Sequence, residues 1–186
     1  YEDKVRFAGS FQDYAENQKQ GILSGFLTLE EGGVLENRME RLDELYEKGI
    51  RVINMTWNHE NCLGYPHNAP HSGHRGLKPF GFEVLERMDE LGIVADVSHL
   101  SDEGFQDIIR YGRRPVIATH PDARSLRTVS RNLSDAMIRQ IADCGGIIGV
   151  NFYSDFLSDD PVSRISDIIR HCRHIINVAG EEVLGI

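Results

Sequence analysis

Residues 93–120 read IVADVSHLSDEGFQDIIRYGRRPVIATH and contain one complete strand–helix–strand unit. The runs Ile93 to Val97 and Pro115 to Thr119 are apolar almost throughout, which is typical of strands buried on both faces of a sheet. A histidine comes shortly after each run, His99 after the first and His120 after the second. The stretch therefore predicts a parallel βα repeat that carries an imidazole at the end of each strand.

The same alternation extends over the rest of the chain. Further strand-like runs are Ile22 to Leu29, Ile50 to Trp57, Ile147 to Phe152 and Val183 to Ile186. The helical patterns run from Leu35 to Tyr46, from Phe82 to Leu91, from the N-cap Ser101 to Gly112, from Leu133 to Ile141, and from the cap Asp160-Pro161 to Gly180. This order predicts an α/β protein, either a doubly wound sheet or part of a (β/α)₈ barrel. Six strands fall short of a complete barrel, which takes about 250 residues.

The composition is that of one globular domain. The chain has 186 residues, of which 40% are hydrophobic and 26% charged, and its formal net charge is −9. An acidic surface repels phosphate backbones, so nucleic acid is excluded as a partner. No apolar run reaches the ~20 residues of a transmembrane segment. Three cysteines without metal-type spacing fit a reducing compartment, and the cytoplasm is the default location in the absence of a visible secretion signal. The composition does not decide whether the chain forms a homodimer.

Polar side chains follow the predicted strands at the point where each one ends. Because the carboxyl ends of parallel strands meet at one mouth of the fold, we expect these side chains to converge there. A carboxylate and several imidazoles at one mouth make a site for zinc or a similar metal. The residues concerned are Glu30 and Glu31, the run Asn58-His59-Glu60-Asn61, His99, His120 and Asn151.

Two other interpretations of the histidines stay open at this point. Single histidines at strand ends are commonly hydrogen-bonded structural residues. The long stretch from Asn58 to Lys78, rich in His, Pro, Gly and Asn, has the character of a functional loop. Its own histidines offer a separate zinc site, made by His59, His67, His71 and His74.

At these residues the sequence resembles the membrane (renal) dipeptidase family of zinc metallopeptidases, within the amidohydrolase-like barrels. The resemblance covers nearly the whole chain, and its pieces occur in the family's order. They are Glu31-Gly32-Gly33, Arg51 to Asn61 (RVINMTWNHEN), Gly76 to Gly81 (GLKPFG), Asp96 to Ser101 (DVSHLS), Val116 to His120 (VIATH), Ser130-Arg131-Asn132, Val150 to Tyr153 (VNFY) and Val178-Ala179-Gly180.

The resemblance implies a (β/α)₈ barrel with two zinc ions at its C-terminal mouth and a hydroxide that bridges them. That hydroxide would attack the peptide bond of a dipeptide substrate. Among neighbouring carboxylates only one faces inward, and the Glu-Gly-Gly motif selects Glu31 as the bridging ligand. The implied site consists of the metal ligands Glu31, His99 and His120, the carboxylate-binding Arg131, the oxyanion-contacting His59, and Asn151 among the substrate-binding residues.

Two elements of the family pattern are not found in residues 1–186. These are the amino-terminal His-x-Asp ligands and the aspartate that follows the last strand. We therefore expect residues 1–186 to form the central portion of a single catalytic barrel domain, with about six βα units. The alternatives to a zinc dipeptidase are an amidohydrolase-type barrel acting on another amide or ester, and a metal-free binding protein that has retained the fold.

Overall fold

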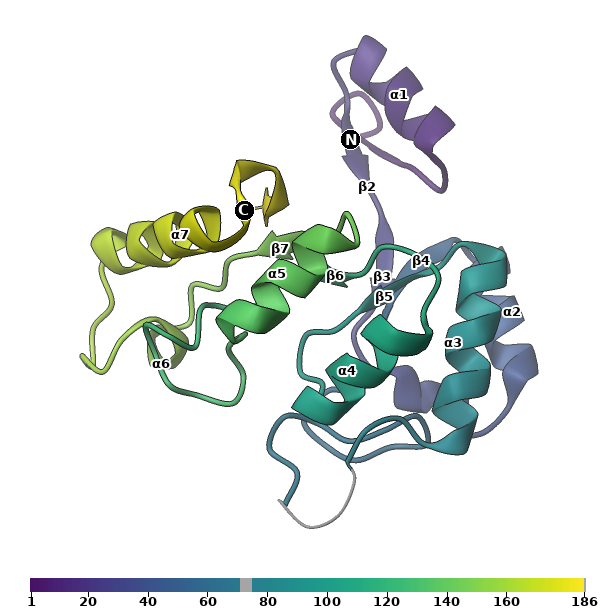
Figure 1. Ribbon diagram of the computed structural model, residues 1–186. Coiled ribbons are helices and arrows are strands. Elements are labelled where there is room, and N and C mark those ends of the chain that lie inside the picture. The colour runs from purple at the N-terminus through teal and green to yellow at the C-terminus, as the bar shows by residue number, and fades with distance from the viewer. Residues whose placement is uncertain (71–74, 186) are drawn as a thin grey trace.

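Six parallel strands form the centre of the molecule in the computed structural model, which describes residues 1–70 and 75–185 (Figure 1). Each strand pairs with the next along the chain, so the spatial order is β3-β4-β5-β6-β7-β8. This is the sequential order of a (β/α)₈ barrel wall, and the α/β class and the incomplete barrel expected from the sequence are confirmed. The strands are β3 (Leu27–Leu29), β4 (Ile50–Asn54), β5 (Val94–Asp96), β6 (Ile117–Ala118), β7 (Ile147–Gly149) and β8 (Leu184–Gly185).

Helices connect successive strands and cover the outer face of the sheet (Figure 1). Ser101 caps α4 as predicted, because its hydroxyl accepts the backbone N–H of Gly104. The helices are α2 (Met39–Glu47), α3 (Pro79–Leu91), α4 (Asp102–Tyr111), α5 (Asp135–Asp143), α6 (Ser154–Leu157) and α7 (Ile165–Ala179), with 3₁₀ turns at Gly32–Leu35 and Glu181–Val183.

The N-terminal part of the chain differs from the sequence expectation. The predicted strand from Ile22 to Leu29 is broken at Phe26 into β2 (Leu23–Gly25) and β3. Strand β2 pairs with β1 (Val5–Phe7) in a separate two-stranded parallel sheet, and α1 (Phe11–Lys19) joins the two. This unit projects away from the main sheet in Figure 1. Neither β1 nor α1 was predicted, because their few apolar residues are largely exposed and give no clear period.

The last long helix begins later than the sequence indicates. Asp160-Pro161 has the form of a helix start, yet α7 begins at Ile165 and the intervening residues are irregular. The actual cap uses Asp167, whose side chain accepts the backbone N–H of Arg164 at 2.9 Å. A carboxylate at the third helical position satisfies a terminal N–H that would otherwise lack a partner. The predicted end at Gly180 is correct.

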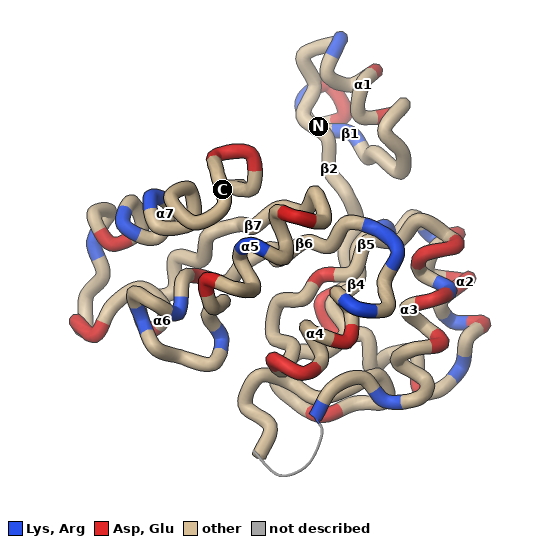
Figure 2. Tube along the Cα trace, in the orientation of Figure 1, with Lys and Arg blue, Asp and Glu red and all other residues tan. Residues whose placement is uncertain are grey.

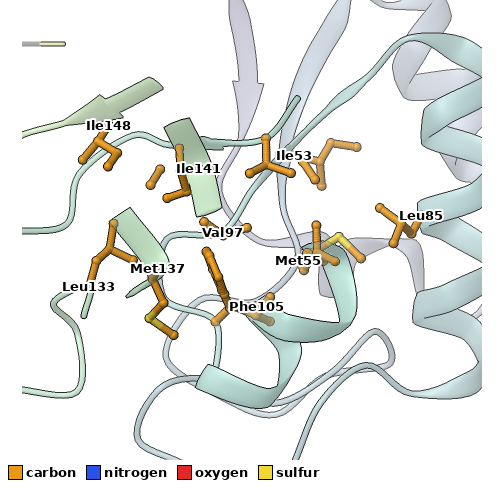
Figure 3. Close-up of a cluster of buried hydrophobic side chains, with 14 of the residues drawn as sticks. Ile53, Met55, Leu85, Val97, Phe105, Leu133, Met137, Ile141 and Ile148 are labelled. Carbon is orange, nitrogen blue, oxygen red and sulfur yellow. The ribbon is translucent and has the colours of Figure 1, made fainter. Parts of the chain in front are cut away.

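The hydrophobic core lies between the sheet and the covering helices (Figure 3). Strand residues such as Ile53 and Ile148 meet helix residues such as Phe105 and Ile141, and all four are almost fully buried. Burial of one such side chain contributes about 1.5–3 kcal/mol to folding. The core therefore fixes the strand ends, which carry the candidate site residues.

Gly149 allows β7 to approach the end of β6 closely. A Cβ atom built on this glycine would lie 2.2 Å from the carbonyl oxygen of Thr119, a distance that no side chain tolerates. Since Thr119 directly precedes His120, the missing side chain helps to place this imidazole at the mouth of the sheet.

Basic and acidic residues are interspersed along the outer helices (Figure 2). None of the helices in residues 1–70 and 75–185 has the length and apolar character needed to span a bilayer.

Candidate active site

Three side chains meet at the carboxyl ends of β3, β5 and β6. The Nε2 atoms of His99 and His120 lie 2.8 Å apart. Glu30 Oε1 lies 3.5 Å from Nε2 of His99 and 3.6 Å from Nε2 of His120. Among the described residues these three form a group whose donor atoms all lie within 4.8 Å of one another. Two imidazoles and a carboxylate are a donor set that suits zinc, so the residues present fit a metal ion.

The fold positions both histidines through their backbones. His99 follows β5 in a left-handed conformation with φ of 67°, which is uncommon for a residue other than glycine. Backbone strain of this kind persists where the surrounding structure requires it and is concentrated at functional sites. His120 follows β6, and its carbonyl oxygen accepts a hydrogen bond of 2.8 Å from the side-chain amide of Asn151.

The structure brings Glu30 within reach of the two histidines, whereas the predicted ligand Glu31 makes other contacts. Glu31 Oε1 accepts from the Gly33 amide at 2.7 Å and from Asn61 Nδ2 at 2.5 Å, while Oε2 accepts from the Trp57 amide at 3.1 Å. Its carboxylate thus caps the 3₁₀ turn after β3 and ties it to the loop after β4. A Cβ on Gly33 would lie 2.6 Å from Glu31 Oε1. In this structure Glu31 therefore caps the turn, and the preceding glutamate faces the mouth.

The electrostatic surroundings keep both imidazoles neutral. Burial lowers the pKa of His99 to about 3, and the charge of Arg131 acts in the same direction. Burial also lowers the pKa of His120, followed by Arg131, whereas Asp96 and Glu30 raise it. Neutral imidazole is the form that binds metals, so the ligand atoms are available at neutral pH.

A buried cation lies close to the histidine pair. Arg131 comes from the loop between β6 and α5, is only 4% exposed, and lines one cavity together with His99 and Ser130. Its Nε, Nη1 and Nη2 atoms have no hydrogen-bond partner in the described part of the chain. Burial lowers the pKa of Arg131 to about 10, so the side chain is still a cation at pH 7. A buried guanidinium without partners is costly, and its planar fork suits a carboxylate ligand.

Asp122 is a second buried acidic group near Arg131. The side chain is fully buried, and within residues 1–70 and 75–185 its carboxylate oxygens make no hydrogen bond of full geometry. Burial raises the pKa of Asp122 to about 7, although the Asn151 amide and Arg131 act to lower it. Asp122 therefore gives Arg131 only partial charge compensation at neutral pH.

The two remaining predicted site residues take other positions. His59 is exposed, and its ring packs edge-on against Trp57 with 6.3 Å between centroids. Asn151 donates to His120 O and accepts from the Tyr153 amide at 2.7 Å. Both polar groups of Asn151 are thus engaged in holding the strand-end loops.

One histidine of the long loop, His67, lies at the site although no role there was predicted for it. The His67 ring centroid is 6.3 Å from that of His99, and Nδ1 lies 2.8 Å from Ser130 Oγ. The His67 amide donates to the carbonyl of His99 at 2.7 Å. No sequence period marks this contact, because it depends on how the loop folds back. The separate loop zinc site predicted with His71 and His74 involves residues outside the described part of the chain.

Comparisons with known proteins agree on one family. The model of the membrane dipeptidase family (Peptidase family M19) matches residues 1–186. An uncharacterised protein from the pqqA 5′ region of Klebsiella pneumoniae is 30% identical over 194 residues, which cover 98% of this chain and 70% of that protein. An uncharacterised dipeptidase of Schizosaccharomyces pombe is also 30% identical over 194 residues, covering 100% of this chain and 46% of that protein.

Solved structures give the same result. A metallopeptidase from Rhodobacter sphaeroides, solved with a phosphinate mimic of the dipeptide L-Ala-D-Ala, matches with a TM-score of 0.90 and 25% identity over 98% of this chain. An amidohydrolase from Pseudomonas aeruginosa matches with a TM-score of 0.89 and 26% identity over 99% of this chain. The chain spans about half the length of these two structures, 54% and 56% respectively.

Proposed function

Because this chain belongs to the membrane dipeptidase family, Peptidase family M19, we propose that the full-length protein is a zinc-dependent dipeptidase. Residues 1–186 would be the central portion of its single catalytic barrel domain. The observation that carries the proposal is a buried guanidinium without hydrogen bonds that lies next to His99, one member of the His₂-Glu cluster. A metal and a carboxylate-binding cation side by side suit a short peptide with a free C-terminus.

Glu30, His99 and His120 would hold the metal. In the proposed two-ion site, a second zinc ion would need further ligands besides Glu30, His99 and His120. When bound, such ions polarise the scissile carbonyl and lower the pKa of a bound water, so that hydroxide is available near pH 7. The R. sphaeroides relative with its dipeptide mimic supports a dipeptide as the substrate.

The protein's own residues then orient the substrate. Arg131 would bind the C-terminal carboxylate through two parallel hydrogen bonds, which restricts substrates to very short peptides. The distance between the guanidinium and the metal ligands would select chain length, and the burial of Arg131 excludes water from the charge pair.

Metal content and substrate range test the proposal together. We expect the purified full-length protein to contain zinc and to hydrolyse L-Ala-D-Ala and L-Ala-L-Ala. N-acyl amino acids and lactones serve as the comparison panel. Turnover of these compounds without turnover of dipeptides would identify the amidohydrolase alternative. Full-length protein that binds no metal and turns over nothing would identify a binding protein.

We assign the substrate contact of the loop to His67 in preference to His59. His67 lies between the His99 ring and the Arg131 loop, and its Nε2 has no partner among the described residues. Burial lowers the pKa of His67 to about 4, so the ring is neutral at pH 7 and Nε2 can accept or donate one hydrogen bond.

His67→Ala is expected to lower kcat/KM for dipeptides by about tenfold, the effect of losing one net hydrogen bond of about 1.4 kcal/mol. The matched variant His59→Ala removes an exposed imidazole and is expected to change kcat/KM by less than about twofold. Steady-state kinetics of both variants decide the assignment. A tenfold loss in His59→Ala with normal His67→Ala would return the role to His59.

A further inference from the structure

The imidazole of His120 is held on its far side by a chain of two polar groups. Its Nδ1 lies 2.7 Å from Thr119 Oγ1, and the Thr119 hydroxyl also bonds to Asp96 Oδ2. Asp96 is 1% exposed and ends β5, while Thr119 directly follows β6. The two strands are adjacent in the sheet, so these contacts link the bases of both histidine-bearing loops.

The direction of each hydrogen bond follows from which atoms carry hydrogen. A carboxylate only accepts, and Asp96 Oδ1 already accepts from the Ser98 amide at 2.9 Å and the Thr119 amide at 3.2 Å. The hydroxyl of Thr119 must therefore donate its single hydrogen to Asp96 Oδ2. Only lone pairs of Oγ1 remain for His120, so Nδ1 carries the hydrogen and Nε2 carries the lone pair.

His99 is fixed in the same tautomer by a different partner. Its Nδ1 lies 3.1 Å from the side-chain carbonyl oxygen of Asn58, which is an acceptor. The two Nε2 lone pairs thus face each other at 2.8 Å, with the Glu30 carboxylate beside them. Three acceptor atoms around one point repel one another unless a cation lies between them.

We propose that Asp96 and Thr119 form a positioning relay that locks His120 in the Nδ1–H tautomer and so makes its Nε2 a metal ligand. The inference rests on the proposed metal site but not on the proposed substrate. In this relay a hydroxyl stands between the carboxylate and the imidazole, where outer-shell partners usually contact the ring directly. Thr119 and Asp96 touch neither substrate nor metal and act only through His120.

The tautomer can be read directly from the ¹⁵N chemical shifts of the imidazole nitrogens in the metal-free full-length protein. We expect Nδ1–H for His120 in the natural protein. Thr119→Val keeps the shape but removes the hydroxyl, so a mixture of tautomers is expected. Zinc affinity, measured by competition with a chelator, should fall by about 10–100-fold. Thr119→Ser should restore both properties. The matched control Thr128→Val removes an exposed hydroxyl outside the site and should change neither.

Asp96→Asn provides a second, independent test, because it is expected to reverse the tautomer of His120. The new amide can still accept the two backbone N–H groups through its oxygen while its nitrogen donates to Thr119. The Thr119 hydroxyl would then donate to His120 Nδ1 and place the ring hydrogen on Nε2, which blocks the ligand atom. We expect the Nε2–H tautomer and loss of zinc at His120 in this variant, with circular dichroism confirming that it is folded.

Two results would overturn the relay. One is an Nε2–H tautomer of His120 in the natural metal-free protein. The other is unchanged zinc affinity in folded Thr119→Val. Failure of the proposed function looks different, because a protein that shows the relay and binds zinc but does not hydrolyse dipeptides refutes only the substrate. Dipeptide hydrolysis with an unperturbed tautomer in Thr119→Val refutes only the relay.

Discussion

Replacing Glu30 with glutamine in the full-length protein is expected to weaken zinc binding by more than the ~10–100-fold typical of outer-shell partners. The carboxylate is the only anionic group within reach of both Nε2 atoms among the described residues, at 3.5 and 3.6 Å. Glutamine keeps the length of the side chain but loses the negative charge that offsets a divalent cation. Turnover of dipeptides should fall in parallel with the metal content.

The neighbouring glutamate provides the matched control. Glu31→Gln is expected to keep zinc and activity but to lower the free energy of unfolding by about 1–3 kcal/mol, because an amide NH₂ would face at least one of its three present donors. Metal content by mass spectrometry and denaturant unfolding of the two variants separate the roles. If Glu31→Gln lost the metal while Glu30→Gln kept it, the ligand assignment made from the geometry would be refuted.

The choice between these two glutamates shows where sequence reasoning reaches its limit. Alternation along a strand states correctly that only one of two neighbours faces the mouth. It does not state which one, because β3 has only three residues and the chain leaves it through a tight capped turn. The two glycines of the motif lie in the turn that the Glu31 carboxylate caps. The backbone turn, which periodicity does not encode, decides the outcome.

Most of the barrel wall could be predicted because its signals are local. Continuous apolar runs mark the six strands, and the amphipathic periods with Ser101, Gly92 and Gly112 mark the helices and their ends. Strand β1 and helix α1 lacked such signals because they expose most of their large hydrophobic residues, Phe7 and Phe11 among them. The predicted start of α7 was wrong because Asp160-Pro161 is equally compatible with an irregular turn.

The candidate site was only partly predictable for a related reason. Strand ends gave His99 and His120, since topology alone brings them together. The contacts of His67 and the engagement of Asn151 depend on loops that fold back over the mouth, and such tertiary contacts leave no period in the sequence. The burial of Arg131 is likewise a tertiary feature that leaves no period in the sequence. It is the reason that we expect a large effect from Arg131→Met.

Arg131→Met in the full-length protein is expected to lower kcat/KM for dipeptides by at least about 30-fold, because loss of one member of a buried charge pair costs about 2–5 kcal/mol. The variant should be no less stable than the natural protein in the absence of substrate. The natural guanidinium is 4% exposed and has no hydrogen-bond partner among the described residues, so a methionine of similar size removes a buried charge without breaking a hydrogen bond. The contact that it gives up is that of the guanidinium with the Phe156 ring, 5.6 Å from the ring centroid.

The stability measurement requires a defined pH because Asp122 lies close to Arg131. The pKa of Asp122 is raised to about 7 from 3.8 by burial, so the cost of its charge in the folded protein grows as the pH rises between these values. Loss of Arg131 removes an influence that lowers this pKa, and the cost then extends to higher pH. At pH 6 the carboxyl is largely protonated in either protein, and the comparison reports on the arginine itself.

Substrates without a free carboxylate complete the test of Arg131. C-terminally amidated dipeptides cannot form the paired hydrogen bonds, so the natural protein should process them poorly and Arg131→Met should process them equally poorly. Arg131→Lys keeps the charge but not the planar fork, and is expected to recover only part of the activity. An equal fractional loss on free and amidated dipeptides would contradict a carboxylate-binding role. A large loss of stability in Arg131→Met at pH 6 would show instead that the guanidinium supports the fold.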